Sequence, residues 1–233
     1  MNINPINNTK YNNSFGHFED NSVNPYSKKQ KAVIATTTAL GVGVASAILA
    51  KKAGYSLAPK KMFSNIKNSY LAKVKYEAKE VISIGVGSCL GGLAGGLMVD
   101  KDKNNRKAKF RESIMQIGNI SIPIMTVSAF AEYGERVCSK LGNKKAALGK
   151  AGFGVLGIYA GVILANNLMN KLGDVMFKNQ RGRGVKATDY SAHLDDMVVA
   201  ANCVSKHPII HAIGRIIPIA LMFAGNEVGN KKS

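Results

Sequence analysis

Two long stretches without a single charged side chain constrain this chain more than any other feature. They are Ala32–Ala50 and Val81–Val99, and each is nineteen residues long. At 1.5 Å per residue, a helix of that length nearly matches the ~30 Å hydrocarbon core of a bilayer. A helix of a soluble domain normally keeps a polar face, so two such runs predict membrane spans.

Three further apolar runs follow, at Ser113–Ala131, Ala151–Met169 and Pro208–Asn226. The last is the weakest, because His211 and Arg215 interrupt it. Together the runs predict an all-α integral membrane protein with four or five spans. We expect one anchor helix followed by two helical hairpins, each pairing a Gly-rich helix with a helix that carries Pro and Glu.

The chain divides into an N-terminal tail and one membrane-embedded helical domain. Residues 1–31 are rich in Asn and have little aliphatic clustering, which predicts a disordered tail. Residues 32–233 form the predicted domain. The first apolar run begins only at Ala32, so an uncleaved signal-anchor is favoured over a conventional secretory signal.

An internal repeat is indicated by two similar segments, Asn119–Gly134 and Gly214–Gly229. In both copies a Pro is followed nine residues later by a Glu, and both residue types are disfavoured within an apolar helix. These pairs are Pro123 with Glu132 and Pro218 with Glu227. If every run crosses the membrane, the two copies run parallel.

Glycine spacing predicts how the helices pack. Gly87, Gly91 and Gly95 form a GxxxGxxxG pattern, with Gly92 and Gly96 as a second pair. This pattern resembles the glycine zippers of many unrelated membrane-associated proteins, a resemblance that implies close helix packing and no particular activity. In lipid, the missing side chain lets two backbones approach closely.

Small residues also recur at four-residue steps in two other runs. In the fourth run the predicted packing residues are Gly157 and Gly161. The first run carries a small-residue face made of Ala35, Ala39, Gly43 and Ala47. These faces predict contacts with neighbouring helices, and they could also join copies of the chain in a homo-oligomer.

The chain is strongly basic, with 32 Lys and Arg against 14 Asp and Glu and a formal charge of +18. Such an excess attracts polyanions, which are nucleic acids or anionic lipid head groups. Because the charged clusters flank apolar runs, the pattern favours an anionic lipid bilayer over nucleic acid. With five spans the basic residues divide almost equally between the two sides, so the positive-inside rule does not choose an orientation.

The sequence contains no motif that predicts catalysis, a cofactor or a metal. His207 and His211 have the spacing of helical metal ligands, but Pro208 displaces His207 from the helical conformation. No P-loop, nucleophile motif or Cys pair with metal-ligand spacing is present. We therefore expect a non-enzymatic protein without cofactor or metal.

The informative polar groups within the runs are Glu132, Arg215 and Glu227. Both Glu residues could end their helices at the membrane interface, or they could form a polar pair or conduction path inside the bundle. Arg215 is expected to pair with Asp195 and Asp196 from the preceding loop.

Three functions follow from these features. The first is a structural or membrane-interaction protein whose basic surface binds anionic lipid. The second is a small pore or transporter, which the repeat and the intramembrane charges favour. The third is a soluble basic helical protein that binds nucleic acid.

Overall fold

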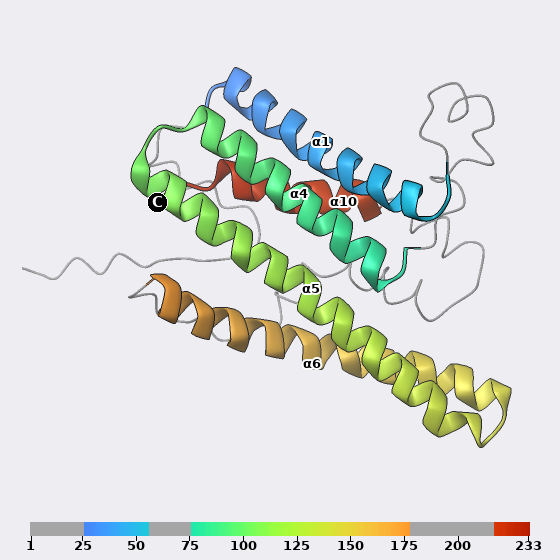
Figure 1. The fold of residues 1–233 in the computed structure, drawn as a ribbon. Coiled ribbons are helices and arrows are strands. Elements are labelled where there is room, and N and C mark those ends of the chain that lie inside the picture. The colour runs from blue at the N-terminus through green and yellow to red at the C-terminus, as the bar shows by residue number, and fades with distance from the viewer. Residues whose placement is uncertain (1–25, 56–75, 178–216) are drawn as a thin grey trace, which may run out of the picture.

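The computed structural model describes residues 26–55, 76–177 and 217–233, and every regular element in these ranges is an α-helix. The helices are α1 (Lys28–Lys52), α4 (Ala78–Val99), α5 (Lys103–Ser139), α6 (Asn143–Phe177) and α10 (Ile217–Asn230), as Figure 1 shows. Among them α1, α4, α5 and α6 are long and apolar enough to cross a membrane. The predicted all-α fold is therefore confirmed for the described part of the chain.

Helix α1 begins earlier than its apolar run, because Ser27 caps it. The backbone N–H of Gln30 donates to the Ser27 hydroxyl oxygen, and the Ser27 N–H donates to Gln30 Oε1 at 3.0 Å. This reciprocal pair is a capping box, whose Ser-x-x-Gln signature is readable in the sequence. Residues 26–31 thus belong to the helical domain, and the predicted tail boundary at residue 31 is wrong. Residues 1–25 lie outside the described part.

Helices α5 and α6 extend well beyond the apolar runs that predicted them. They contain 37 and 35 residues, which corresponds to about 55 and 52 Å of helix. At the start of α5, the Asp102 carboxylate accepts hydrogen bonds from the backbone N–H groups of Asn104 and Asn105 at 2.7 and 3.0 Å. Hydropathy marks only the apolar centre of such a helix, whereas capping determines where the helix begins.

Helix α4 lies between α1, α5 and α10, and α6 packs along α5 (Figure 1). The structure therefore differs from the predicted second hairpin, which paired the runs 151–169 and 208–226. In the described residues α10 packs chiefly on α4 instead of α6. The core formed by α1, α4, α5 and α10 includes Ile84, Cys89, Ile124, Leu221 and Val228.

Helix α10 runs antiparallel to α5. Lys109 near the start of α5 contacts Lys231 just after α10, and Gln116, about two turns further into α5, contacts Glu227, which precedes Lys231. The two copies of the proposed repeat, which lie in α5 and α10, are therefore antiparallel in this structure and not parallel. The described part of α10 has 14 residues, about 21 Å, and residues 208–216 of its run lie outside the described ranges.

Both described chain ends lie at the same end of the bundle. The backbone N–H of Ser233 donates to Asn105 Oδ1 at 3.0 Å, and Tyr26, just before α1, contacts Asp100 in the link between α4 and α5. Five full crossings would place the two chain ends on opposite sides. In a bundle that spans a membrane, chain ends on the same side would correspond to an even number of crossings.

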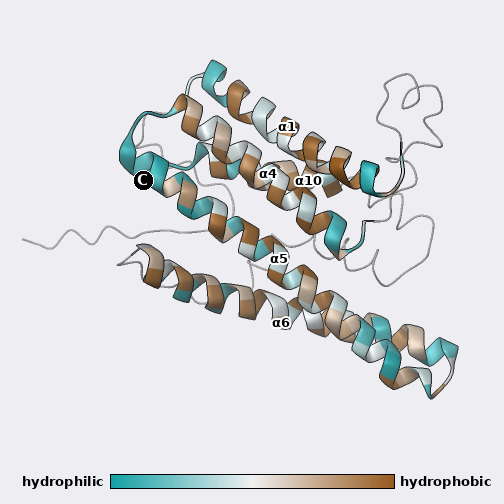
Figure 2. Ribbon diagram, viewed as in Figure 1, coloured by the Kyte–Doolittle hydropathy of each residue, from teal (hydrophilic) through white to brown (hydrophobic). Residues whose placement is uncertain are grey.

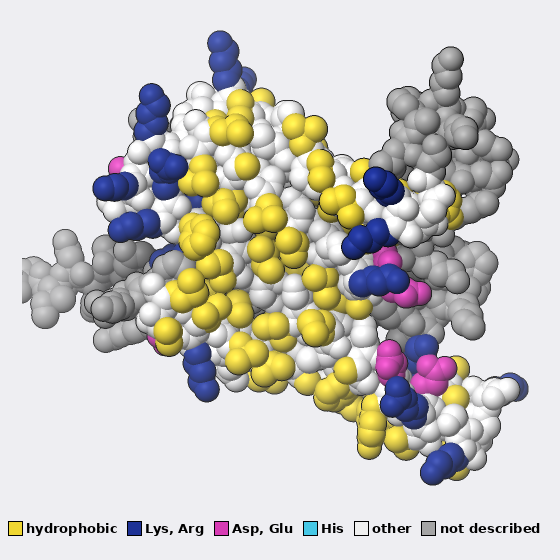
Figure 3. Space-filling model, in the orientation of Figure 1, with side chains coloured by type: hydrophobic (Ala, Val, Ile, Leu, Met, Phe, Trp, Pro, Cys, Tyr) yellow, Lys and Arg dark blue, Asp and Glu magenta, His cyan; other side chains and the backbone are white. Residues whose placement is uncertain are grey.

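The face of the bundle shown in Figures 2 and 3 is apolar between two charged ends. Within the apolar windows of the four long helices, only 17% to 44% of the residues are buried. Large exposed apolar side chains include Leu40, Val44, Leu90, Tyr159, Ile163 and Phe223. Soluble monomers rarely expose contiguous apolar surface of this extent, so the arrangement is compatible with a membrane protein.

Candidate functional site

The glycines Gly87, Gly91 and Gly95 of α4 lie against the backbone of α1. Their neighbours on α1 are Gly41 and Ala45 for Gly87, Thr37 and Thr38 for Gly91, and Ile34 and Thr37 for Gly95. A Cβ atom at Gly87 would lie 2.7 Å from the Gly41 carbonyl oxygen, closer than Cβ atoms approach other atoms in proteins. Any larger residue at these positions would therefore displace α1.

A second glycine contact joins α4 to α10. Gly92 and Gly96 of α4 face Gly225 and Gly229 of α10, and a Cβ atom at Gly96 would lie 2.7 Å from the Gly229 carbonyl oxygen. The two GxxxG patterns run in the same direction and match in spacing. This match explains why α10 packs on α4. The Gly225–Gly229 pattern is readable in the sequence and is the signal that predicts this contact.

The glycines of α6 pack on the middle of α5. Cβ atoms at Gly157 and Gly161 would lie 2.8 Å from Val127 Cα and 2.6 Å from Pro123 Cα. Nearer the connecting turn, a Cβ atom at Gly149 would lie 2.7 Å from the carbonyl oxygen of Gly134 on α5. Close backbone packing thus extends along much of this helix pair.

The predicted small-residue face of α1 is mostly exposed in the described structure. Ala35, Ala39 and Gly43 are exposed, and no atom lies within 4 Å of a Cβ atom built on Gly43. The expectation that a neighbouring helix packs on this face is therefore wrong at Gly43 for the described helices. The neighbouring face of α1, which contains Gly41 and Ile34, packs on α4 instead. Gly41 lets the two backbones approach closely, and the Ile34 side chain packs against Gly229 of α10.

The two predicted intramembrane glutamates, Glu132 and Glu227, are not brought together in the described structure. Glu132 is 66% exposed and lies 3.7 Å from Arg136, and α5 continues past it to Ser139, so Glu132 does not end its helix. Glu227 accepts a hydrogen bond from Gln116 Nε2 at 3.1 Å. Arg215, together with its expected partners Asp195 and Asp196, lies outside the described residues, and that pairing stays a prediction.

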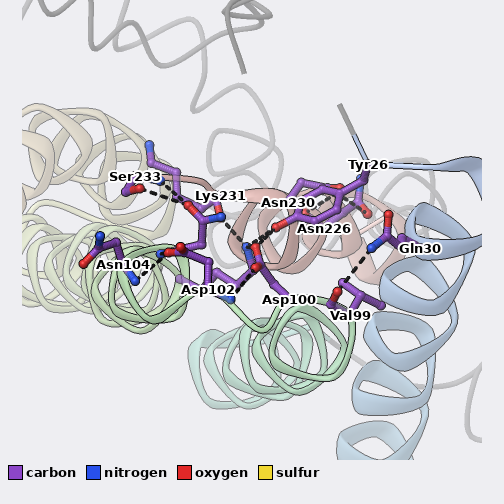
Figure 4. A network of polar contacts seen from close by, with 12 residues as sticks. Tyr26, Gln30, Val99, Asp100, Asp102, Asn104, Asn226, Asn230, Lys231 and Ser233 are labelled. Carbon is purple, nitrogen blue, oxygen red and sulfur yellow. Dashed lines mark hydrogen bonds and ion pairs between the residues drawn. The ribbon is translucent and has the colours of Figure 1, made fainter. Parts of the chain in front are cut away.

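A polar cluster that the sequence did not reveal surrounds Lys109 of α5, whose side chain is 0% exposed. Its amino group donates to Tyr26 Oη at 2.6 Å, lies 3.3 Å from Asp100 Oδ2 and also donates to the Lys231 carbonyl oxygen. The Tyr26 hydroxyl in turn donates to Asp100. Figure 4 shows Tyr26, Asp100 and Lys231 converging from three separate segments. We call these four residues the Lys109 cluster.

The cluster shifts the protonation equilibria of its members outside the helices. Burial raises the pKa of Tyr26, and the hydrogen bond and negative charge of Asp100 raise it further. Burial alone would raise the pKa of Asp100, but hydrogen bonds from Tyr26, Asp102 N–H and Lys109, with the Lys109 charge, hold it below its ordinary value. Asp100 is therefore ionised at neutral pH, and it compensates the charge of the buried lysine.

A second polar contact continues along the same face of α5. Glu112 lies 3.1 Å from Lys231 Nζ, and Gln116 Nε2 donates to Glu112 Oε1 and to Glu227 Oε2, both at 3.1 Å. Lys109, Glu112 and Gln116 are three and four residues apart, which places them on one helix face. These side chains link α5 to α10 over about two turns.

The described residues form no cluster of metal-ligating side chains. They contain no group of three or more His, Cys, Asp or Glu side chains that could hold a metal ion. Cys89 is buried and Cys138 is half-buried, and both are free thiols. His207 and His211 lie outside the described ranges.

No family model matches the chain, and neither a curated protein nor a solved structure is significantly similar to it. The case for its function therefore depends on the geometry described above.

Proposed function

We propose that this chain is an integral, multi-pass membrane protein with a structural or membrane-interaction role, whose basic ends bind anionic lipid. The observation that carries the proposal is the band of outward-facing apolar side chains between the charged ends (Figure 3). Leu40 at the middle of α1 is 62% exposed, and Leu90 at the middle of α4 is 53% exposed. Lipid is the solvent in which such exposure is favourable.

The interior supports the same proposal, because the helix contacts are made by glycine and small side chains. Each glycine destabilises a helix in water by about 1 kcal/mol relative to Ala, and α4 places five of them within three turns. In lipid no hydrophobic effect drives helices together, and close backbone packing replaces it. Small residues inside and large apolar residues outside are the expected arrangement in a membrane.

The charges lie where the lipid head groups would be. Exposed basic residues flank α1 at both ends, at Lys28 and Lys29 before the apolar run and at Lys51 and Lys52 after it. A basic residue near an anionic membrane surface contributes about 1 kcal/mol of attraction. We therefore propose anionic phospholipid as the partner of these ends.

Two matched substitutions test the membrane placement. Leu40 and Leu141 are both 62% exposed, but Leu40 lies in the apolar band and Leu141 lies in the turn between α5 and α6. In lipid, Leu40→Lys loses about 3 kcal/mol on insertion scales, whereas Leu141→Lys is tolerated. We expect the wild type to stay in the pellet after carbonate extraction of membranes and Leu40→Lys to lose abundance. Release of the wild type, or equal behaviour of the two variants, refutes the proposal.

A small pore or transporter is the second candidate. It is favoured by the buried polar side chains Lys109, Ser113 and Gln116 along one face of α5. A flux assay in proteoliposomes tests this function, because a structural protein leaves the ion permeability of the liposomes unchanged. The carbonate extraction also separates both membrane functions from a soluble nucleic-acid-binding protein.

Self-association is a further proposal about partners. The glycines of α4 and α6 predicted to join copies are occupied by α1, α10 and α5 within one chain. The small-residue face of α1 around Ala39 and Gly43 is open in the described structure and is available to a second copy. The mass of the purified protein in detergent, measured by light scattering, distinguishes monomer from dimer.

A further inference from the structure

We propose that the end of the bundle where both described chain ends meet is one basic platform that binds the head-group phosphates of anionic phospholipids. The inference rests on the proposed membrane placement and specifies which surface recognises the lipid. We call this surface the terminal platform. Its basic residues come from three segments and are Lys28, Lys29, Lys31, Lys101, Lys103, Arg106, Lys107, Lys231 and Lys232.

The Lys109 cluster brings these three segments together. Tyr26 precedes α1, Asp100 precedes α5, and the Lys231 carbonyl belongs to the C-terminal tail, and all three contact the Lys109 amino group. Two further contacts tie the same segments. Gln30 Nε2 donates to the Val99 carbonyl at 3.2 Å, and the Lys232 amino group lies 4.2 Å from the centre of the Tyr26 ring. Basic residues that are far apart in the sequence therefore lie at the same end of the bundle.

Three acidic residues close to the platform are already engaged. Asp100 compensates the buried Lys109, Glu112 pairs with Lys231, and the Asp102 carboxylate caps α5. Within the described ranges, Lys101, Lys103, Arg106 and Lys107 are exposed and have no acidic partner; all four lie in the first part of α5 or just before it. These four charges therefore face outward with little local neutralisation.

The opposite end of the bundle is basic but arranged differently. The turn between α5 and α6 projects away from the ends of α1 and α4, as Figure 1 shows, so its charges are separated from Lys51 and Lys52. Two of its basic residues are also paired, Arg136 with Glu132 at 3.7 Å and Lys150 with Glu135 at 2.7 Å. The basic residues of the two ends therefore differ in how closely they lie together.

The spacing of the basic residues affects lipid binding, because salt screening limits the range of each charge. The Debye length is about 8 Å at physiological salt, so only neighbouring cations act together on one head group. Each cation near an anionic surface strengthens binding about fivefold. A lipid phosphate at the terminal platform meets several cations at once, whereas one at the distant turn meets few.

Two matched variants test the platform. The first replaces Lys101, Lys103, Arg106 and Lys107 with Gln, and the control replaces Arg136, Lys140, Lys144 and Lys145 with Gln. Each removes three Lys and one Arg, so the net charge changes equally. The full chain is reconstituted in bilayers of equal phosphatidylglycerol and phosphatidylcholine and extracted in mild detergent. The two lipids that copurify with it are then quantified by mass spectrometry.

We expect the wild type to enrich phosphatidylglycerol, the platform variant to lose this enrichment about fivefold or more, and the control to change it less than twofold. Extraction in about 1 M salt, where the Debye length is about 3 Å, should abolish the enrichment. No enrichment by the wild type, or equal loss in both variants, overturns the platform. If the platform is overturned but the wild type stays in the membrane pellet after carbonate extraction, the proposed membrane placement still stands. Release of the wild type by carbonate refutes both the membrane placement and the platform.

Discussion

The contact between α4 and α10 predicts that Gly92→Ala destabilises the bundle. A Cβ atom at Gly92 would lie 2.5 Å from the carbonyl carbon of Gly225, whereas ordinary van der Waals contact begins at 3.4 Å. Because that neighbour is backbone, and the Gly225 carbonyl oxygen lies closer still, α10 must move away by at least about 0.9 Å. A gap of that size forfeits a quarter to a half of the dispersion energy across the affected contacts. Overpacking of this kind lowers the free energy of unfolding by about 1 to 3 kcal/mol.

The matched control is Gly43→Ala on the outer face of α1, where no atom lies within 4 Å of the added methyl group. That substitution should leave stability unchanged or raise it by up to about 1 kcal/mol, the helix-propensity difference between Ala and Gly. The measurement is unfolding of the purified protein in mixed micelles with increasing denaturing detergent, followed by circular dichroism. If Gly92→Ala and Gly43→Ala unfold at the same detergent fraction, the packing argument is refuted.

Three other predictions follow from the end of the bundle that carries the Lys109 cluster. Lys109→Met leaves the buried Asp100 carboxylate uncompensated, so it should lower the free energy of unfolding by about 3 kcal/mol in the same assay. Lys107→Met is the control, and because Lys107 is exposed it should have little effect. The pKa of Asp100 lies below its ordinary value of 3.8, so the stabilising contribution of its carboxylate is complete above about pH 4. That contribution is lost as the pH falls through the lowered pKa. The midpoint of unfolding in detergent should therefore fall in acid for the wild type, and this fall should be absent from Asp100→Asn. Cysteines introduced at Ser27 and Ser233 should be labelled from the same side of a sealed vesicle, and labelling from opposite sides would contradict the arrangement of the chain ends.

The sequence alone determined the character of the helices. A run of nineteen uncharged residues can satisfy its backbone in lipid only as a helix, and α4, which ends at Val99, ends where the sequence predicted. Periodicity also identified which residues of α4 and α6 are small enough for a backbone to approach. The cap at Ser27 was readable too, because the Ser-x-x-Gln pattern acts within one turn.

Only the tertiary structure decided which faces meet. A row of small residues on a helix permits close approach of another helix but does not determine which helix approaches. In the sequence, Ala35, Ala39 and Gly43 are therefore as suitable for helix packing as the face through Gly41 that packs on α4. The choice depends on two surfaces fitting together, such as the matched GxxxG spacing that joins Gly92 to Gly225. Information of that kind is shared between helices more than a hundred residues apart.

The Lys109 cluster shows the same division most clearly. In the sequence Lys109 is one of several basic residues in a charged stretch, where a solvated lysine is the ordinary expectation. Its burial requires Asp100 to compensate the charge, and Tyr26 and the Lys231 carbonyl to accept its remaining hydrogen bonds. Local sequence sets the conformation of a helix through nearest neighbours. The environment of a charge depends on partners that only the folded chain brings within hydrogen-bonding distance.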